Sequence, residues 1–173
     1  MKQKTLFKLS DYKSDFGGEA LKNKRKTRRP LSNKNAIHLV LRADTQKTDF
    51  AQKTASLLKN KNQIEKMFLK YATKFNVKVY KKALASNHIH VLALFESRES
   101  YVQFIKAVAG QMAQKLKIKW QHRPWSRIIH WGKAFQIAVQ YVLQNELEAM
   151  GAIPYQPRGR QRQRPLESVA RRP

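Results

Sequence analysis

The stretch VKVYKKALASNHIHVLALF, residues 77–95, decides the fold. Its first half, residues 77–85, alternates apolar and polar side chains as a half-buried strand does. Ser86-Asn87 is a turn signal. Residues 88–95 are apolar apart from two histidines and predict a second strand. Two strands joined by a short turn therefore form the centre of the expected fold.

The segments on either side predict further elements of both kinds. Apolar side chains recur at strand or helix periodicity in five of them. These are a strand at residues 36–43 (AIHLVLRA), a helix at 62–76, a helix at 101–116, a short strand at 128–131 and a helix at 133–150. The resulting order is β-α-β-β-α-β-α.

This order predicts an α+β fold, a ferredoxin-like split β-α-β arrangement. Two helices would cover one face of an antiparallel sheet. The other face is left for a substrate or for the added C-terminal helix, residues 133–150. Element order does not by itself set a function.

The charge of the chain indicates a polyanionic partner. Lys and Arg number 36 against 11 Asp and Glu, and the formal net charge is +25. So large a charge repels itself unless DNA, RNA or an acidic membrane surface offsets it. No apolar run approaches the roughly 20 residues that span a bilayer, so we expect nucleic acid rather than a membrane. The absence of cysteine excludes disulfides, zinc fingers and thiol catalysis, and it fits a cytoplasmic protein.

Charge and hydrophobicity divide the chain into three expected parts. Residues 1–35 form a basic N-terminal arm, residues 36–150 a folded core, and residues 151–173 an Arg-rich C-terminal tail. The arms fit flexible tails, and an Arg-rich tail of that kind can still bind phosphate.

His88 and His90 are the first candidate site residues. Successive strand side chains point to opposite faces, so the two histidines share one face while Ile89 and Val91 face a core. Two imidazoles one residue apart can bind a metal ion. They could instead be ordinary polar positions at a strand end. The surrounding strand is apolar, however, and histidines without partners would carry a desolvation cost there.

Tyr141 and Asn145 lie four residues apart on the last predicted helix and share a face. A tyrosine hydroxyl, with an ordinary pKa of about 10, needs a base or a metal-polarised electrophile to act as a nucleophile. A metal ion on the two histidines could bind a scissile phosphate, and the Asn145 carbonyl oxygen could complete its shell. Without the histidine pair, Tyr141 would be read as a packed helix tyrosine.

These residues resemble the HUH superfamily of tyrosine transposases, in its IS200-like branch associated with repetitive extragenic palindromes (REP). The resemblance covers about residues 17–151 and is carried by five motifs. The motifs are RKTRRPLS at 25–32, IHLVLR at 37–42, NHIHVL at 87–92, WSRIIHWG at 125–132 and YVLQN at 141–145.

The resemblance implies a transposase that nicks and rejoins hairpin-containing single-stranded DNA. It implies that His88, His90 and Asn145 bind Mg²⁺ or Mn²⁺. It further implies that Tyr141 forms a 5′-phosphotyrosine link and releases a 3′-OH. Residues 36–150 would then be the catalytic domain.

One feature departs from the family pattern. Relatives often have Asn-Pro after the tyrosine, whereas here Asn145 is followed by Glu146. The helix can therefore run on, and Gln144 or Glu148 could replace Asn145 as the third ligand.

Basic and aromatic side chains near the expected site are candidates for DNA binding, because Arg binds phosphate and bases stack on aromatic rings. The candidates are Arg25, Arg28, Arg29, Arg123, Trp125 and Arg127. Trp125 and Trp131 could instead pack on the sheet and leave the arginines to DNA. We expect His38 and His130 to be structural.

Two other functions stay open. A non-catalytic DNA- or RNA-binding module on the same scaffold would normally show Phe or Tyr, rather than histidines, on its strand faces. A replication initiator or relaxase would use the same chemistry in a larger chain. The sequence fits either a monomer or a homodimer.

Overall fold

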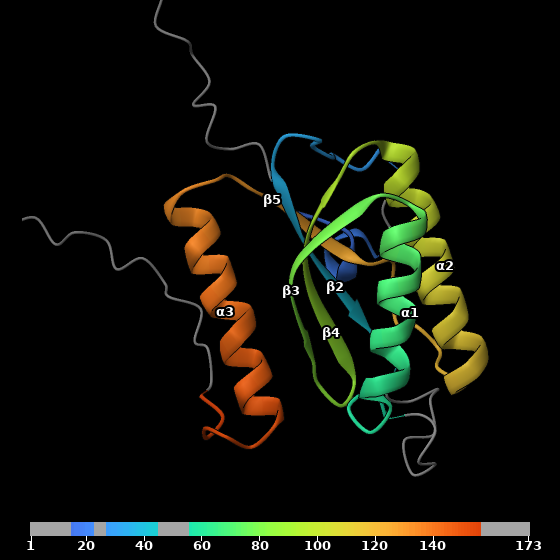
Figure 1. Ribbon diagram of the computed structural model, residues 1–173, viewed down its shortest axis with the longest axis vertical. Coiled ribbons are helices and arrows are strands. Elements are labelled where there is room, and N and C mark those ends of the chain that lie inside the picture. The colour runs from blue at the N-terminus through green and yellow to red at the C-terminus, as the bar shows by residue number, and fades with distance from the viewer. Residues whose placement is uncertain (1–14, 23–26, 45–55, 157–173) are drawn as a thin grey trace, which may run out of the picture.

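The computed structural model describes residues 15–22, 27–44 and 56–156, and its sheet has the strand order β1-β5-β2-β4-β3 (Figure 1). Every neighbouring pair is antiparallel. The strands are β1 (Asp15–Phe16), β2 (Ala36–Arg42), β3 (Val77–Leu84), β4 (His88–Phe95) and β5 (Trp125–Ile129). The helices are η2 (Gly18–Leu21, a 3-10 turn), α1 (Lys61–Lys74), α2 (Arg98–Leu116) and α3 (Lys133–Ala149).

The predicted fold class is confirmed. The segment β2-α1-β3-β4-α2-β5 is a split β-α-β arrangement, because β4 lies between β2 and β3, and β5 pairs on the far side of β2. The two central strands, β2 and β4, are therefore paired on both edges. Their register places Val40 opposite His90 and His38 opposite Leu92.

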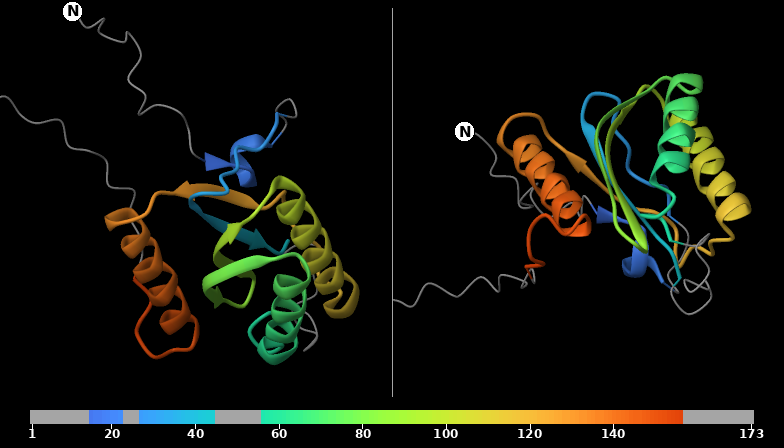
Figure 2. Two further views of the ribbon diagram at one scale, coloured as in Figure 1. Left: turned by 45° about the horizontal axis from the view of Figure 1, so that its top comes forward. Right: turned by 60° about the horizontal axis from the view of Figure 1, so that its bottom comes forward.

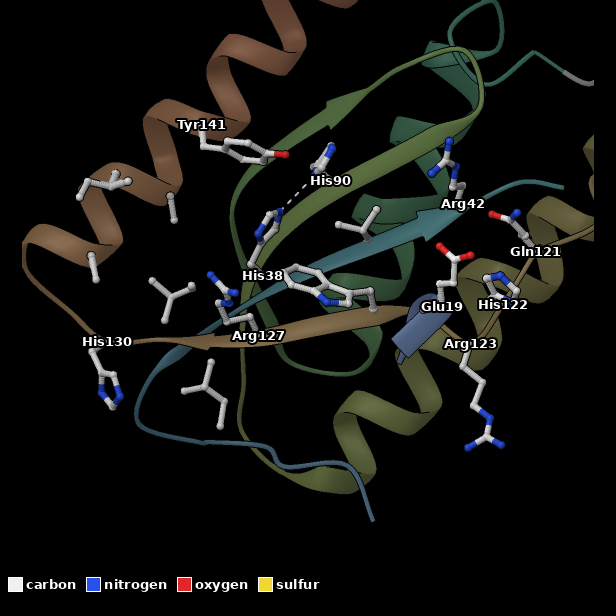
Figure 3. Close-up of a pocket in the computed structure, with 18 residues that line it drawn as sticks. Glu19, His38, Arg42, His90, Gln121, His122, Arg123, Arg127, His130 and Tyr141 are labelled. Atoms are coloured by element: carbon white, nitrogen blue, oxygen red, sulfur yellow. Dashed lines mark hydrogen bonds between the residues drawn. The ribbon is translucent and has the colours of Figure 1, made fainter. Parts of the chain in front are cut away.

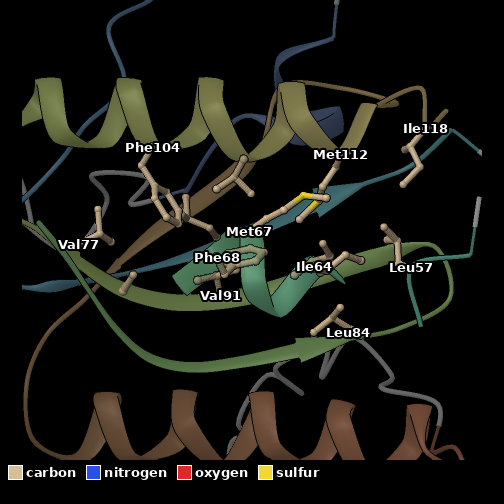
Figure 4. Packing of buried hydrophobic residues seen from close by; sticks show 14 of the residues in the cluster. Leu57, Ile64, Met67, Phe68, Val77, Leu84, Val91, Phe104, Met112 and Ile118 are labelled. Atoms are coloured by element: carbon tan, nitrogen blue, oxygen red, sulfur yellow. The ribbon is translucent and has the colours of Figure 1, made fainter. Parts of the chain in front are cut away.

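Helices α1 and α2 cover one face of the sheet and enclose the main core (Figures 2 and 4). Ile37 and Leu39 of β2, and Ile89 and Val91 of β4, point into it and are fully buried. Phe104 of α2 packs edge-on against two other phenylalanines. The predicted strand alternation is confirmed, so the neighbouring residues His38, His88 and His90 lie on the opposite face.

Helix α3 packs on that opposite face, mainly along β3 and β4 (Figures 1 and 2). A second, smaller cluster joins it to the sheet. Its members are Ala36, Leu92, Ile129 and Ala138, with Tyr80, Phe135 and Val139 packed against them. Because α3 lies toward β3, the β2–β5 part of this face stays open beside it.

Two differences from the prediction concern the edge of the sheet. Strand β5 begins at Trp125 rather than at residue 128, so Trp125 and Arg127 are strand residues that face α3 beside Val40 and His38. The sequence did not indicate this earlier start, because Ser126 and Arg127 interrupt the apolar pattern that marks a strand. Strand β1 extends the sheet beyond the expected 36–150 core.

Arg29 fastens β1 to the sheet. Its guanidinium donates hydrogen bonds to the Ser126 hydroxyl, to the Pro124 carbonyl at 2.6 Å and to the Phe16 carbonyl at 3.3 Å. The guanidinium also lies over the Phe16 ring, 4.6 Å from its centroid. Burial lowers the pKa of Arg29, and these acceptors offset part of the desolvation cost.

Over the described ranges, no helix combines the length and apolar character needed to cross a membrane.

Candidate active site

A cleft of about 770 Å³ runs between α3 and the open β2–β5 part of the sheet (Figure 3). Its α3 wall consists of Ala134, Ile137, Ala138 and Tyr141, which recur every three or four residues and so share one helix face. Its sheet wall includes His38, Val40, Arg42, His90, Trp125 and Arg127. Gln121, His122 and Arg123 line the end nearest η2.

Two of the predicted site residues, His90 and Tyr141, meet in this cleft. The Tyr141 ring stands edge-on to His90 with 5.5 Å between ring centroids. His88 is next along the same face of β4, 5.0 Å from His90 between centroids. Figure 3 shows the Tyr141 hydroxyl directed towards His90. Strand β4 and helix α3 thus bring His90 and Tyr141 together, and His88 lies beside His90 without lining the cleft itself.

His38, which we expected to be structural, lies inside this site. Its Nε2 is 3.0 Å from His90 Nδ1, and the two rings stack at 5.3 Å. The Tyr141 ring stands edge-on to His38 with 5.7 Å between ring centroids, so His38, His90 and Tyr141 all contact one another. A signal existed in the sequence, since His38 alternates with Ile37 and Leu39. Only the β2–β4 register, however, reveals which residue it meets.

His38 is a neutral imidazole at neutral pH. Burial lowers its pKa to about 4; the nearby Arg127 charge also lowers it, whereas Asp15 raises it. A neutral imidazole carries a proton on one nitrogen and a lone pair on the other. His38 can therefore accept a hydrogen bond from His90 or donate one to it.

The histidine pair has the donor chemistry that a divalent cation needs. His88 Nδ1 is 2.8 Å from the Asn87 Oδ1, which can only accept, so Nδ1 carries the proton and Nε2 the lone pair. A partner on one ring nitrogen fixes the tautomer of metal-binding histidines in this way. Within the described ranges, no three His, Cys, Asp or Glu side chains cluster closely enough to hold a metal.

Asn145, the predicted third ligand, is buried on α3 one turn after Tyr141. Its side-chain amide donates to the Tyr141 carbonyl oxygen at 2.6 Å. The alternatives Gln144 and Glu148 are joined to each other by a 2.9 Å hydrogen bond. Helix α3 does run on past Asn145, as predicted. The assignment of a third ligand among these residues stays a prediction.

The arginines predicted to bind DNA occupy different places. Arg123 and Arg127 line the cleft, and Arg127 also forms an ion pair with Asp15 of β1. Arg29 forms hydrogen bonds with the protein, and its predicted contact with DNA stays a prediction. Arg28 is exposed. Arg25 lies outside the described residues.

The aromatic candidates also separate. Trp125 lines the cleft edge-on to His38, with the Arg127 guanidinium over its ring. Trp131 lies after β5, packs against Tyr80 and Phe135 and remains 44% exposed. His130 lines the outer end of the cleft and is exposed, rather than buried as a structural histidine would be.

Known proteins share the sequence pattern and the fold of this chain. The family model for IS200-like transposases matches residues 32–143, a range that contains both histidines of β4 and Tyr141. The structure of a REP-associated tyrosine transposase bound to a REP hairpin aligns with a TM-score of 0.57 and 14% identity. That alignment covers 72% of this chain and 73% of that chain, and it supports the fold.

A Deinococcus radiodurans R1 protein described as a transposase candidate aligns with a TM-score of 0.41, too low to carry an argument. Its identity is 14%, over 70% of this chain and 97% of that chain. No curated protein matches the chain significantly.

Proposed function

Because the chain belongs to the family of IS200-like transposases, we propose that it nicks and rejoins hairpin-containing single-stranded DNA with Tyr141 as its nucleophile. The observation that carries the proposal is the position of Tyr141. Its ring is held against His90 and His38 in the cleft, with the hydroxyl directed towards His90 (Figure 3).

The proposed reaction is a transesterification. The Tyr141 oxygen loses its proton and attacks the scissile phosphorus, and the bond from phosphorus to the 3′ oxygen breaks. The 5′ phosphate of the downstream strand is then linked to Tyr141, and the upstream strand leaves with a 3′-OH. Rejoining is the reverse step, in which a 3′-OH attacks the phosphotyrosine and returns the proton to Tyr141. One phosphodiester is exchanged for another, so no external energy source is needed.

His88 and His90 would hold Mg²⁺ or Mn²⁺ through their Nε2 atoms, with Asn145 as the proposed third ligand. A divalent ion bound there supplies Lewis-acid polarisation of the phosphate oxygens. The protein positions the nucleophile. Tyr141 is fixed on α3, which packs on the sheet through the small cluster that includes Ala138 and Ile129. Holding the nucleophile in place lowers the activation barrier, because less translational and rotational entropy is lost on reaching the transition state.

The cleft supports single-stranded DNA as the substrate. Arg42, Arg123 and Arg127 line it and can neutralise phosphates, while Trp125 offers a ring for stacking. The apolar α3 wall of Ala134, Ile137 and Ala138 faces these cations. A duplex hides its base faces, whereas a single strand presents both bases and phosphates to such a mixed surface.

The test is a covalent trapping assay with a hairpin oligonucleotide bearing single-stranded flanks and Mn²⁺. A 3′-end label should move with the protein on a denaturing gel, and a 5′-end label should appear on a shorter strand that a polymerase can extend from its 3′-OH. Tyr141→Phe should abolish both products. Tyr155→Phe, a change at a tyrosine that is 71% exposed, should retain them.

Each other outcome has a meaning. An adduct formed by Tyr141→Phe would remove Tyr141 from the mechanism, and an adduct carrying the 5′ label would reverse the proposed polarity. Strand cleavage that continues after exhaustive chelation would exclude a metal ion from the mechanism. Tight hairpin binding with no adduct would favour the non-catalytic binding module.

A further inference from the structure

We propose that His38 is a positioning residue that holds His90 in the tautomer whose Nε2 can bind a divalent cation. The inference rests on the proposed function, because it concerns the same histidine pair. His38 itself touches neither DNA phosphate nor metal in this role and acts through His90.

The contact between the two rings is close and enclosed. His38 Nε2 and His90 Nδ1 are 3.0 Å apart, and the exposed fractions of the side chains are 7% and 5%. The rings stack with an angle of 27° between their planes. Such a distance between two ring nitrogens is a hydrogen bond, and burial excludes the water that would compete for it.

The β-sheet register creates this contact. Val40 lies directly opposite His90, and His38 lies opposite Leu92, so His38 and His90 are diagonal neighbours on one face. Diagonal pairs are within reach of long or aromatic side chains. Both strands are internal to the sheet, so the backbone positions of both histidines are fixed by pairing on either side.

The direction of this one hydrogen bond decides what His90 can do. If His90 Nδ1 carries the proton and donates, Nε2 keeps a lone pair that can bind a cation. If His38 Nε2 donates instead, His90 Nδ1 accepts and the proton of His90 sits on Nε2. Only the first arrangement matches His88, whose Nδ1 donates to Asn87.

Further contacts hold the His38 ring in the required orientation. Trp125 stands edge-on to it at 5.3 Å, and Tyr141 stands edge-on at 5.7 Å. His38 is therefore enclosed by rings from β5, β4 and α3. Because its ring cannot turn without disturbing these neighbours, its Nε2 stays directed at His90.

The test uses two substitutions at His38 and two readouts. His38→Phe keeps a ring for packing but removes the acceptor, whereas His38→Gln places an amide oxygen at a similar reach. Long-range ¹H–¹⁵N NMR on metal-free protein reports the His90 tautomer. Titration with Mn²⁺ alone reports affinity. His130→Phe, a change at a cleft histidine outside this contact, serves as the control for Mn²⁺ affinity.

In the wild-type protein, we expect the proton of His90 on Nδ1. His38→Phe should shift it to Nε2 and weaken Mn²⁺ binding by about 10- to 100-fold, the usual effect of losing such a partner. His38→Gln should restore the Nδ1 proton and most of the affinity. If His38 only fills space, the tautomer of His90 should be unchanged in both variants. Mn²⁺ affinity should then be closer to wild type in His38→Phe than in His38→Gln.

Two results would overturn the inference: a wild-type His90 protonated on Nε2, or unchanged or tighter Mn²⁺ binding by a folded His38→Phe protein. The wild-type measurement needs no variant, so a folding failure of His38→Phe does not prevent the test. Failure of the proposed function is separate. If His88→Ala and His90→Ala leave Mn²⁺ binding intact, the metal site is wrong whatever the tautomer of His90.

Discussion

Arg127 of β5 and Asp15 of β1 lie opposite each other in the sheet and are joined by two hydrogen bonds, one of them 2.7 Å between Nη2 and Oδ2. The hydrogen bonds and charge of Asp15 raise the pKa of Arg127, although burial opposes this. The guanidinium that faces the cleft is therefore matched by a carboxylate before any phosphate arrives. A DNA phosphate that contacts Arg127 therefore competes with this carboxylate for the guanidinium charge.

Asp15→Asn should strengthen single-stranded DNA binding, because it removes a carboxylate that competes with phosphate. We expect roughly a fivefold gain at low salt, since a unit charge about 4 Å away is worth about 1 kcal/mol in water. The gain should shrink as salt screens the charge. Fluorescence anisotropy over a salt series measures both effects. Glu96→Gln makes the same charge change at an exposed residue and should have little effect. A loss of affinity in Asp15→Asn would contradict the competition.

Arg29→Met should destabilise the fold by about 2–3 kcal/mol, because it leaves the acceptors that the guanidinium now satisfies without a donor. Those acceptors include the Pro124 carbonyl and the Ser126 hydroxyl. Arg29→Lys should recover little, since one ammonium cannot reproduce the fork of donors. Urea unfolding measures the change. Arg28→Met, at the exposed neighbouring residue, should stay within about 0.5 kcal/mol of wild type. Equal losses of stability at the two positions would refute the structural role of Arg29.

Phe104→Ala should reduce the free energy of unfolding by about 3–5 kcal/mol, the usual result of opening a cavity at a buried phenylalanine. Phe104 is 1% exposed and contacts Phe68 and Phe95. Leu69→Ala on α1 removes an apolar side chain that is 72% exposed and should change little. Calorimetry measures the loss of stability in each variant. Equal losses in the two variants would contradict the central place of Phe104 in the core.

Two glycines should respond to alanine in opposite directions. Gly110 is inside α2 with open space where a Cβ would lie, so Gly110→Ala should stabilise the protein by about 0.5–1 kcal/mol. Gly17 has φ of 88°, and its Cβ would fall 2.2 Å from the Pro124 carbonyl oxygen. Gly17→Ala should therefore detach β1 and lower the midpoint of thermal unfolding. A neutral Gly17→Ala would show that β1 adds nothing to stability.

Trp125→Leu should weaken single-stranded DNA binding by about 1–3 kcal/mol if a base stacks on this ring. Its ring lines the cleft, whereas Trp120 packs beside the main core and donates to the Ala109 carbonyl at 3.0 Å. Trp120→Phe is thus the matched change away from the cleft. Filter binding at fixed salt compares them. Equal losses would mean that the effect at Trp125 comes from stability rather than from stacking.

The sequence predicts the histidine face and the tyrosine helix because both depend on local periodicity. Alternation along β4 places His88 and His90 together, and helical spacing places Tyr141 beside a buried stripe. The role of His38 depends instead on how two strands distant in sequence align, and a shift of one residue would turn it to the other face. Periodicity within one strand carries no information about that alignment.

Strand β1 and the contacts of Arg29 within the protein were not predicted, for a different reason. Two residues, Asp15 and Phe16, are too few to show any period. Arg29 lies in a basic run whose members look alike in sequence, yet one guanidinium is turned inwards and its neighbour Arg28 is exposed. Net charge predicts that such a run binds a polyanion, but not which of its arginines the fold retains for itself.

The separate packing of α3 has a consequence for how this site could evolve. The helix that carries Tyr141 packs on the sheet through a cluster that includes Ala36, Leu92 and Ala138 and is separate from the main core. Substitutions that tilt or slide α3 therefore need compensation on this face of the sheet and leave the core under α1 and α2 in place. Lineages could adjust the distance between nucleophile and histidines, and so exchange one target strand for another, while inheriting the rest of the domain unchanged.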